Sequence, residues 1–380
     1  MNEFAGPGAS PRAALATLAA LVDPRAFASL ADMPPGPRLL ARGAFTAAAL
    51  VSVLTGRSGA APGDEDAVIS IGKVGDHLRM LNVLSRMRRP GARALPAVFA
   101  NDTAAGLERL FDGISLTVNG GRQGAAFLPA ALAARRSAPR YARALAIQPM
   151  VQQPLAIAYG NAIAARTIAN GTGVVAGVRR LPLDTRSWRA AYQFFLASTF
   201  PEASFAATPA VAAHLRWHGD ASREIVVHPG GTSHPRGLVP EVLVAFARLV
   251  TERGYRTTIA GSRAEGPALR ALFGDTAGYA IGEPMEDLAR RLASARALVA
   301  IDSSLMNLAD AVGTPSVIAY TTTDPAACGP FYTRTIAVPD PGMTPLGVDP
   351  EIVWSRASEG HGPAIATGGL LSAFLSLVAP

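Results

Sequence analysis

Short apolar runs alternate with amphipathic segments along most of the chain after residue 65. Unbroken apolar runs, unlike alternating ones, are typical of parallel strands that are covered on both faces. The segments between the runs space their apolar side chains three or four residues apart, as Leu78, Leu81 and Leu84 are, which is the spacing of a helix that buries one face. The pattern therefore predicts an α/β protein built from repeated strand–helix units around parallel sheets.

Two series of such units follow one another along the chain. The first predicts strands over residues 67–71, 97–100, 114–118, 144–148 and 174–178, and helices over 77–89, 104–111 and 154–169. The second predicts strands over residues 224–228, 257–260, 297–301 and 316–320, and helices over 240–253, 264–273, 285–295 and 305–312.

Two series in a chain of 380 residues indicate two doubly wound domains. We expect a helical amino-terminal extension over residues 1–65, a first Rossmann-like domain over 66–215 and a second over 216–380. The boundary falls in the mixed polar, aromatic and histidine-containing stretch 201–222. Doubly wound domains bind ligands at the carboxyl ends of their strands, so we expect the functional site in a cleft between the two domains.

The net charge of +7 is distributed unevenly between the two parts of the chain. Residues 1–220 contain 23 basic and 13 acidic side chains, a net of +10, whereas residues 221–380 contain 12 and 15, a net of −3. The basic part could face an anionic substrate, a membrane surface or nucleic acid. No nucleic-acid-binding motif accompanies the charge, so we expect an anionic substrate and no nucleic acid.

Other classes are excluded by composition. A single cysteine excludes a disulfide framework and a multi-cysteine metal site, and the six histidines show no metal-ligand spacing, so we expect no metal. The amino-terminal residues lack the basic region of a signal peptide, and the most apolar stretch, 43–54, is too short to span a bilayer. We therefore expect a cytoplasmic protein.

The first candidate for chemistry is the loop Gly72-Lys-Val-Gly-Asp76, between a predicted strand and a predicted helix. Asp76 can act as a general base toward a substrate hydroxyl. It can equally cap the helix that it opens. Lys73 is the only lysine of the chain, so it is either there by chance or contacts a donor phosphate or an acceptor anion; we assign the same candidate role to His77.

Two further loops, which follow strands of the second series, offer anion-binding groups. The loop 228–237 carries Thr232, Ser233 and Arg236, whose hydroxyls and guanidinium can bind phosphate, although a plain turn would have the same composition. In the stretch 301–309, the residues Ser303 and Ser304 fall at a helix amino terminus, where they can bind an anion, cap the helix or do both.

Three other residues complete the candidate set. Asn307 lies one turn into the same helix and can direct its amide toward the helix start. Glu265 follows a predicted strand and can accept hydrogen bonds from a ribose or serve as a first-turn helix residue. Glu283 precedes the helix predicted over residues 285–295.

Together these loops resemble the heptosyltransferase family of bacterial lipopolysaccharide synthesis, glycosyltransferase family 9, over residues 66–335. That family opens its first helix with a Gly-Asp pair, here Gly75-Asp76. Its later signature, roughly Asp-Thr-Gly-Leu-Ser-His-Leu-Ala followed by Ala-Leu-Gly-Val-Pro-Thr and a Thr-Asp-Pro turn, is matched by residues 302–309, 311–316 and 323–325. This chain departs from it at Ser303, Ser304 and Asn307, and offers Arg236 where the family often has a phosphate-binding lysine.

The resemblance implies a GT-B fold, in which two Rossmann-like doubly wound domains face a central cleft, and an inverting glycosyltransferase. It implies ADP-heptose as co-substrate without a further cofactor, Asp76 as catalytic base, and an anionic glycan or glycolipid acceptor at the cytoplasmic face of the inner membrane. By the same resemblance, the donor contacts are Asp302 to the sugar, Ser303, Ser304, Thr232, Ser233, Arg236 and Asn307 to the diphosphate, Glu265 to the ribose and the backbone near Glu283 to the base.

Two alternatives stay open. The first is an epimerase or hydrolase that acts on a nucleotide sugar on the same fold, which would need no acceptor. The second is a binding or scaffold protein derived from a glycosyltransferase, which the departures at Ser303, Ser304 and Asn307 favour.

Overall fold

The structure, a computed structural model, describes residues 65–91, 94–119, 127–134, 141–146, 153–170, 178–181, 187–208, 211–230, 238, 240–321, 323, 325–341 and 365–379. The extension predicted over residues 1–65 therefore lies, except for Glu65, outside the described residues. The candidate phosphate ligands Thr232, Ser233 and Arg236 lie outside them as well.

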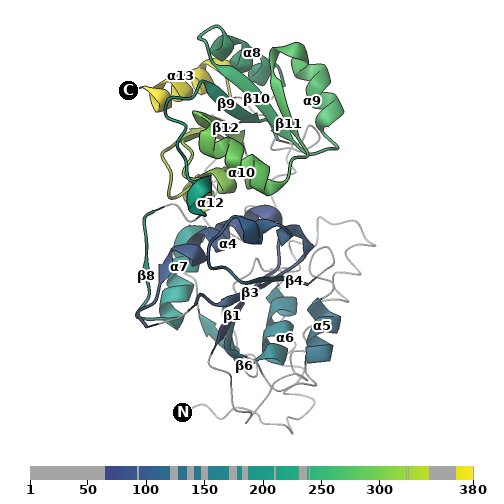
Figure 1. Cartoon of the computed structure of the whole chain (residues 1–380), viewed down its shortest axis with the longest axis vertical. Coiled ribbons are helices and arrows are strands. Elements are labelled where there is room, and N and C mark those ends of the chain that lie inside the picture. Colours follow the sequence, from purple (N-terminus) through teal and green to yellow (C-terminus); the bar gives the residue numbers. More distant parts are fainter. Residues whose placement is uncertain are drawn as a thin grey trace.

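Two six-stranded sheets, each fully parallel, form the framework of the molecule (Figure 1). The first has the order β4 (Leu116–Val118), β3 (Ala97–Ala100), β1 (Asp66–Ser70), β5 (Tyr141–Ala146), β6 (Ala164–Asn170) and β7 (Val178–Leu181). The second has the order β11 (Gly278–Ile281), β10 (Arg256–Gly261), β9 (Glu224–His228), β12 (Ala297–Ile301), β13 (Ser316–Tyr320) and β14 (Thr335–Pro339). Both follow the Rossmann order 3-2-1-4-5-6.

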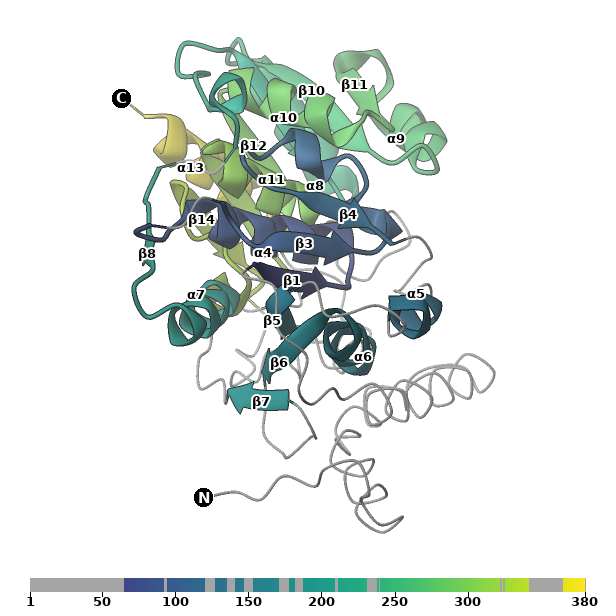
Figure 2. The ribbon, with the colours of Figure 1, turned by 60° about the horizontal axis from the view of Figure 1, so that its bottom comes forward.

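Helices cover both faces of each sheet, as the unbroken apolar strands require. In the first sheet, α5 (Phe127–Ala134) and α6 (Gln153–Ile163) pack on one face, and α4 (Val74–Arg86) and α7 (Trp188–Thr199) on the other. In the second, α8 (Pro240–Thr251), α9 (Gly266–Phe273) and α13 (Thr367–Val378) cover one face, and α10 (Met285–Ser294) and α11 (Ser304–Val312) the other. Figure 2 shows α5 and α6 on the side of the first sheet remote from the second.

Short elements join these layers. They are the strand pair β2 (Met87–Arg88) and β8 (Ser204–Phe205), helix α12 (Pro325–Cys328), and the 3-10 turns η1 (Asp102–Ala104), η2 (Leu107–Arg109), η4 (Ala213–Leu215) and η5 (Gly274–Thr276). Among the described residues, no helix is both long and apolar enough to cross a membrane.

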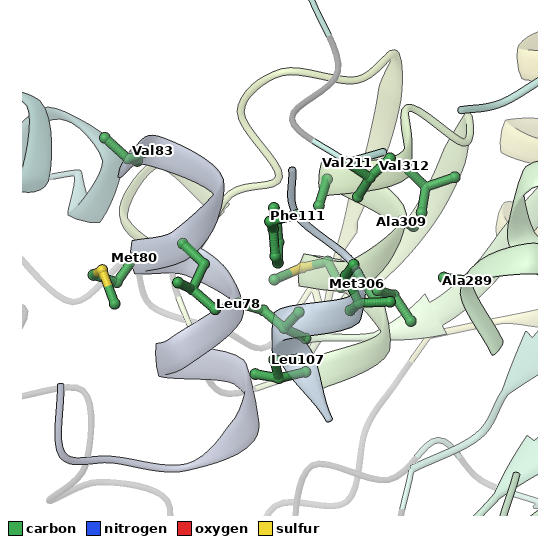
Figure 3. Packing of buried hydrophobic residues seen from close by; sticks show 14 of the residues in the cluster. Leu78, Met80, Val83, Leu107, Phe111, Val211, Ala289, Met306, Ala309 and Val312 are labelled. Atoms are coloured by element: carbon green, nitrogen blue, oxygen red, sulfur yellow. The ribbon is translucent and has the colours of Figure 1, made fainter. Parts of the chain in front are cut away.

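The α4/α7 face of the first sheet packs directly against the α10/α11 face of the second. Buried apolar side chains from both halves form one continuous cluster, in which Leu78 of α4 and Met306 of α11 have no exposed surface. Figure 3 shows Phe111 between the α4 side chains and Met306, with Ala309 and Val312 to its right. The two domains therefore share a hydrophobic core.

The fold class predicted from the sequence is confirmed: the chain is an α/β protein with two Rossmann-like parallel sheets. Some elements differ from the prediction. The helix predicted over residues 104–111 is the pair of turns η1 and η2, interrupted at Gly106, whose φ of 87° breaks a helix. The helix predicted over 154–169 ends at Ile163, and β6 follows at once, because a run of small apolar residues fits either structure.

Candidate active site

The strand order brings the candidate loops to the positions where doubly wound sheets bind ligands. In each sheet the order reverses beside the first strand, between β1 and β5 and between β9 and β12. The loop that starts at Gly72 leaves β1, and the stretch that starts at Asp302 leaves β12. Both therefore lie at the carboxyl ends of strands next to a topological switch point.

The two loops meet at the start of helices α4 and α11. Gly75, in the first turn of α4, has no side chain, and a Cβ built there would lie 3.1 Å from Asn307 Nδ2 and 3.6 Å from Ser304 Cα. A larger residue would push the helices apart. The structure thus brings together two motifs that are more than 220 residues apart in the sequence.

Asp76 has the local geometry of a helix cap. Its Oδ2 accepts a hydrogen bond of 3.0 Å from the backbone N–H of Lys73, which is the N-cap residue of α4. Gly72 permits this contact, since a Cβ there would lie 2.9 Å from Asp76 Cβ and Oδ2. The half-buried carboxylate makes no further hydrogen bond to a described residue, so Oδ1 can receive a proton. Its role as a base stays a prediction, as does a role of the exposed Lys73 in binding an anion.

The assignment of His77 to acceptor or phosphate binding is not supported by its position. The side chain is fully buried, with Nδ1 2.7 Å from Ser70 Oγ and Nε2 2.8 Å from Asn101 Oδ1. Burial lowers the pKa of His77 below 6.5, so the ring is neutral. Asn101 also bonds the backbone of Gly72 in both directions, at 3.0 Å each. His77 therefore braces the Gly72–Asp76 loop from behind.

Ser303 and Ser304 lie at the start of α11 as the sequence predicts. Ser303 is the N-cap residue by backbone geometry, but its side chain makes no capping bond. Its Oγ is buried without a hydrogen-bond partner among the described residues. Burying an unpaired hydroxyl is unfavourable, so this oxygen is suited to bind a ligand that reaches the helix amino terminus.

Asn307 directs its amide toward the start of α11, and its contact with a donor diphosphate stays a prediction. Its Nδ2 donates to the carbonyl oxygen of Ser303 at 3.1 Å, and its Oδ1 accepts from Arg79 Nε at 3.1 Å. The Arg79 guanidinium also lies 3.9 Å from the buried carboxylate of Asp302, measured from Nη2 to Oδ1. Arg79 was not among the predicted site residues, although its spacing of three residues from Asp76 places both on one face of α4.

The side chains of the two nucleoside candidates are engaged locally. Glu265 Oε2 accepts the backbone N–H of Ser262 at 2.7 Å. Burial alone would raise the pKa of Glu265, but this bond and the nearby His228 lower it below its ordinary value. Glu283 forms an ion pair of 2.7 Å with Arg291. The ribose contact of Glu265 and the base contact of the backbone near Glu283 stay predictions.

His228, the last residue of β9, is a site-adjacent residue for which the sequence analysis proposed no role. Its Nδ1 lies 2.9 Å from the carbonyl oxygen of Ala260, to which it donates, and burial lowers its pKa below 6.5. The described residues contain no group of three or more His, Cys, Asp or Glu side chains that could hold a metal ion.

Comparisons with known proteins bear on the family and the fold. Residues 245–342 match the family model of glycosyltransferase family 9 (heptosyltransferase), a segment that includes β12, α11 and β13. No curated protein sequence matches the chain.

Solved structures share the fold. A family 9 glycosyltransferase from Veillonella parvula is 15% identical with a TM-score of 0.65, and the match covers 84% of this chain and 99% of that one. An E. coli heptosyltransferase solved with ADP is 16% identical with a TM-score of 0.59, covering 83% and 100%. E. coli ADP-heptose LPS heptosyltransferase II is 16% identical with a TM-score of 0.56, covering 83% and 98%.

These findings confirm the resemblance and the glycosyltransferase class that the sequence predicted: the chain carries a glycosyltransferase family 9 (heptosyltransferase) segment within a GT-B fold.

Proposed function

We propose that this protein is an inverting glycosyltransferase that moves heptose from ADP-heptose to a hydroxyl group of an anionic glycan or glycolipid. The observation that carries the proposal is the contact between the two loops. Gly75 brings the first turn of α4, which carries Asp76, against the start of α11 at Ser304, so a proton acceptor and an anion-binding helix end lie together.

The second domain would hold the donor. The amino terminus of α11 carries a partial positive charge and free backbone N–H groups, which suit the diphosphate. The unpaired Ser303 Oγ supplies a further hydrogen-bonding group. The family match lies in this domain, and a relative of the same fold was solved with ADP.

The first domain would supply the base. As the acceptor oxygen forms its bond to the anomeric carbon, the carboxylate of Asp76 takes the acceptor's proton. The bond between the anomeric carbon and the diphosphate oxygen breaks, and its electron pair leaves with the diphosphate. A single displacement of this kind inverts the anomeric configuration. The helix dipole and cationic side chains stabilise the leaving diphosphate.

The charge distribution supports an anionic acceptor, since residues 1–220 carry the net charge of +10. Contact of this domain with the cytoplasmic face of the inner membrane, where a glycolipid acceptor would lie, is part of the proposal.

A thermal-shift screen with ADP-, UDP- and GDP-linked sugars tests the donor. ADP-heptose at a hundred times its dissociation constant should stabilise the protein by about 2.7 kcal/mol. Equal stabilisation by all three nucleotides would contradict the choice of ADP. No stabilisation by any of them would contradict nucleotide-sugar binding and favour the scaffold alternative.

A further inference from the structure

We infer that Arg79 of the first domain binds the leaving diphosphate of the donor and that Asn307 of the second domain positions it there. The inference rests on the proposed function. It assigns part of the diphosphate contact to a residue of the first domain that the sequence analysis did not name.

The position of Arg79 places its charge beside the proposed diphosphate site. Arg79 lies one turn after Asp76 on α4, and its guanidinium reaches across to α11. Nε is fixed by a hydrogen bond of 3.1 Å to Asn307 Oδ1. Nη2 lies 3.9 Å from Asp302 Oδ1, one residue before Ser303, whose buried hydroxyl has no hydrogen-bond partner among the described residues. The cation is therefore held beside the amino terminus of α11, where the diphosphate is proposed to bind.

The guanidinium of Arg79 has hydrogen-bonding capacity that the described residues do not use. A guanidinium has five N–H donors. Among the described residues, Arg79 makes only the bond to Asn307, since 3.9 Å to Asp302 is an ion pair and too long for a hydrogen bond. The side chain is only 14% exposed, so these donors lack most of their contact with water. A diphosphate can accept from both Nη groups at once.

Positive charge gathers around Arg79. The amino termini of α4 and α11 converge at Gly75 and Ser304, which brings two positive helix ends together. Burial alone would lower the pKa of Arg79, but the nearby Cys328, Asp302 and Asp76 raise it above its ordinary value, so the side chain is a permanent cation. Arg79 and the two helix ends together carry about two positive charges, which balance the carboxylates of Asp76 and Asp302, so a diphosphate bound here would not be opposed by a net negative charge.

The alternative is that Arg79 only holds the two helices together. The two roles differ in their dependence on the second phosphate of the nucleotide. A structural strut would affect ADP and AMP alike, whereas a ligand of the leaving diphosphate would affect ADP more.

The test is calorimetric titration of the full chain with ADP and with AMP, for wild type and five variants. Arg79→Gln should lower the affinity for ADP about tenfold to a hundredfold, which is the effect of losing a charge-assisted hydrogen bond. The affinity for AMP should change much less. Arg79→Lys keeps the positive charge, so its affinity for ADP should lie between those of wild type and Arg79→Gln. This variant keeps the test valid if Arg79→Gln folds poorly.

Asn307→Ala should lower the affinity for ADP less than Arg79→Gln does. The variant that combines both substitutions should bind ADP no more weakly than Arg79→Gln alone. The matched control is Arg89→Gln. Arg89 is also partly buried, at 18% exposure, and pairs with Asp66 at 3.3 Å, at the opposite end of β1. Its ADP affinity should equal that of wild type.

The possible outcomes separate the inference from the proposed function. Wild type that binds no ADP overturns both. Wild type that binds ADP, with Arg79→Gln unchanged or with equal losses for ADP and AMP, overturns the inference and leaves the proposed function standing.

Discussion

The two halves of the molecule share one strand order but differ in the hydrogen bonding of two loops, the loop after β1 in the first half and the loop after β12 in the second. In the first half, Asn101 and Thr103 bond the Gly72 backbone and His77 bonds both of them, so the loop after β1 is fully braced. In the second half, Ser303 at the end of β12 keeps a buried hydroxyl without a partner among the described residues.

This difference fits the two roles proposed for the loops, holding a catalytic base and binding a ligand. A base must be held in one geometry before the acceptor arrives, which a satisfied hydrogen-bond network achieves. A ligand-binding helix end must keep its donors unpaired until the ligand supplies acceptors. The family match to residues 245–342 lies wholly in the second half, and the excess of positive charge lies in the first. We therefore interpret the first half as the acceptor and base side, and the second as the donor side.

The largest expected effect is on the base. Asp76→Asn should lower turnover by about 10² to 10⁴-fold, the usual contribution of a general base, and leave ADP affinity nearly unchanged. Asparagine can still accept the Lys73 N–H, so the helix cap and the fold should persist. Initial rates and calorimetry measure the two quantities. Glu108→Gln, an exposed change in the same half, is the control. If the turnover of Asp76→Asn were near that of wild type, Asp76 would not be the catalytic base.

The next effect concerns the contact between the halves. Gly75→Val should lower the free energy of unfolding by about 1–3 kcal/mol, because its side chain would collide with Asn307 and Ser304. Turnover should also fall, since the two helix starts would separate. Chemical denaturation measures the change. Gly368→Ala is the matched control, since a Cβ there meets nothing within 4 Å. A Gly75→Val protein as stable as wild type would show that the halves do not need this close approach.

A smaller effect concerns the buried His77 and the partly buried His228. Burial lowers the folded-state pKa of His77 and of His228 below 6.5. As the pH falls, the unfolded chain therefore binds protons at these side chains before the folded chain does. Their stabilising contribution is complete above pH 6.5 and is lost as pH falls from 6.5 through the folded pKa. The slope of stability with pH is at most about 1.4 kcal/mol per pH unit for each histidine.

Replacing either histidine with asparagine should therefore flatten the dependence of unfolding free energy on pH below 6.5, and the two changes should add because the residues lie in different halves. Denaturation at a series of pH values measures the slopes. A single variant that removed the whole slope would show that only one half is sensitive to protonation in this range.

The smallest effect is at the surface of the second half. Arg290 lies on α10, is 53% exposed and pairs with Glu286 and with Asp287. Arg290→Gln should change the free energy of unfolding by less than about 1 kcal/mol and leave donor affinity unchanged. A large loss of ADP affinity in thermal-shift titration would show that the donor site extends to this face.

The sequence was sufficient for the framework because strands that are buried on both faces leave an unbroken apolar signal, as at β9, β12 and β13, which have the predicted bounds. It was insufficient where local patterns are ambiguous: α7 and β11 were not predicted, and the small apolar residues around Ile163 fit helix and strand equally.

The site was predictable in part for a related reason. Glycine, aspartate and serine after a strand mark a ligand loop locally, whereas a contact such as Arg79 with Asn307 joins residues 228 positions apart. Only the folded structure brings such residues together. The same applies to His77, whose burial depends on Asn101 and Thr103 from another strand end.

The most direct test of the account is the release of ADP from ADP-heptose, measured with and without a phosphorylated glycolipid acceptor, with the anomeric configuration of the product read by NMR. The account predicts ADP release that requires the acceptor and a product of inverted configuration. Release at the same rate without acceptor would contradict a transferase and indicate a hydrolase or epimerase, and a product of retained configuration would contradict direct displacement assisted by Asp76.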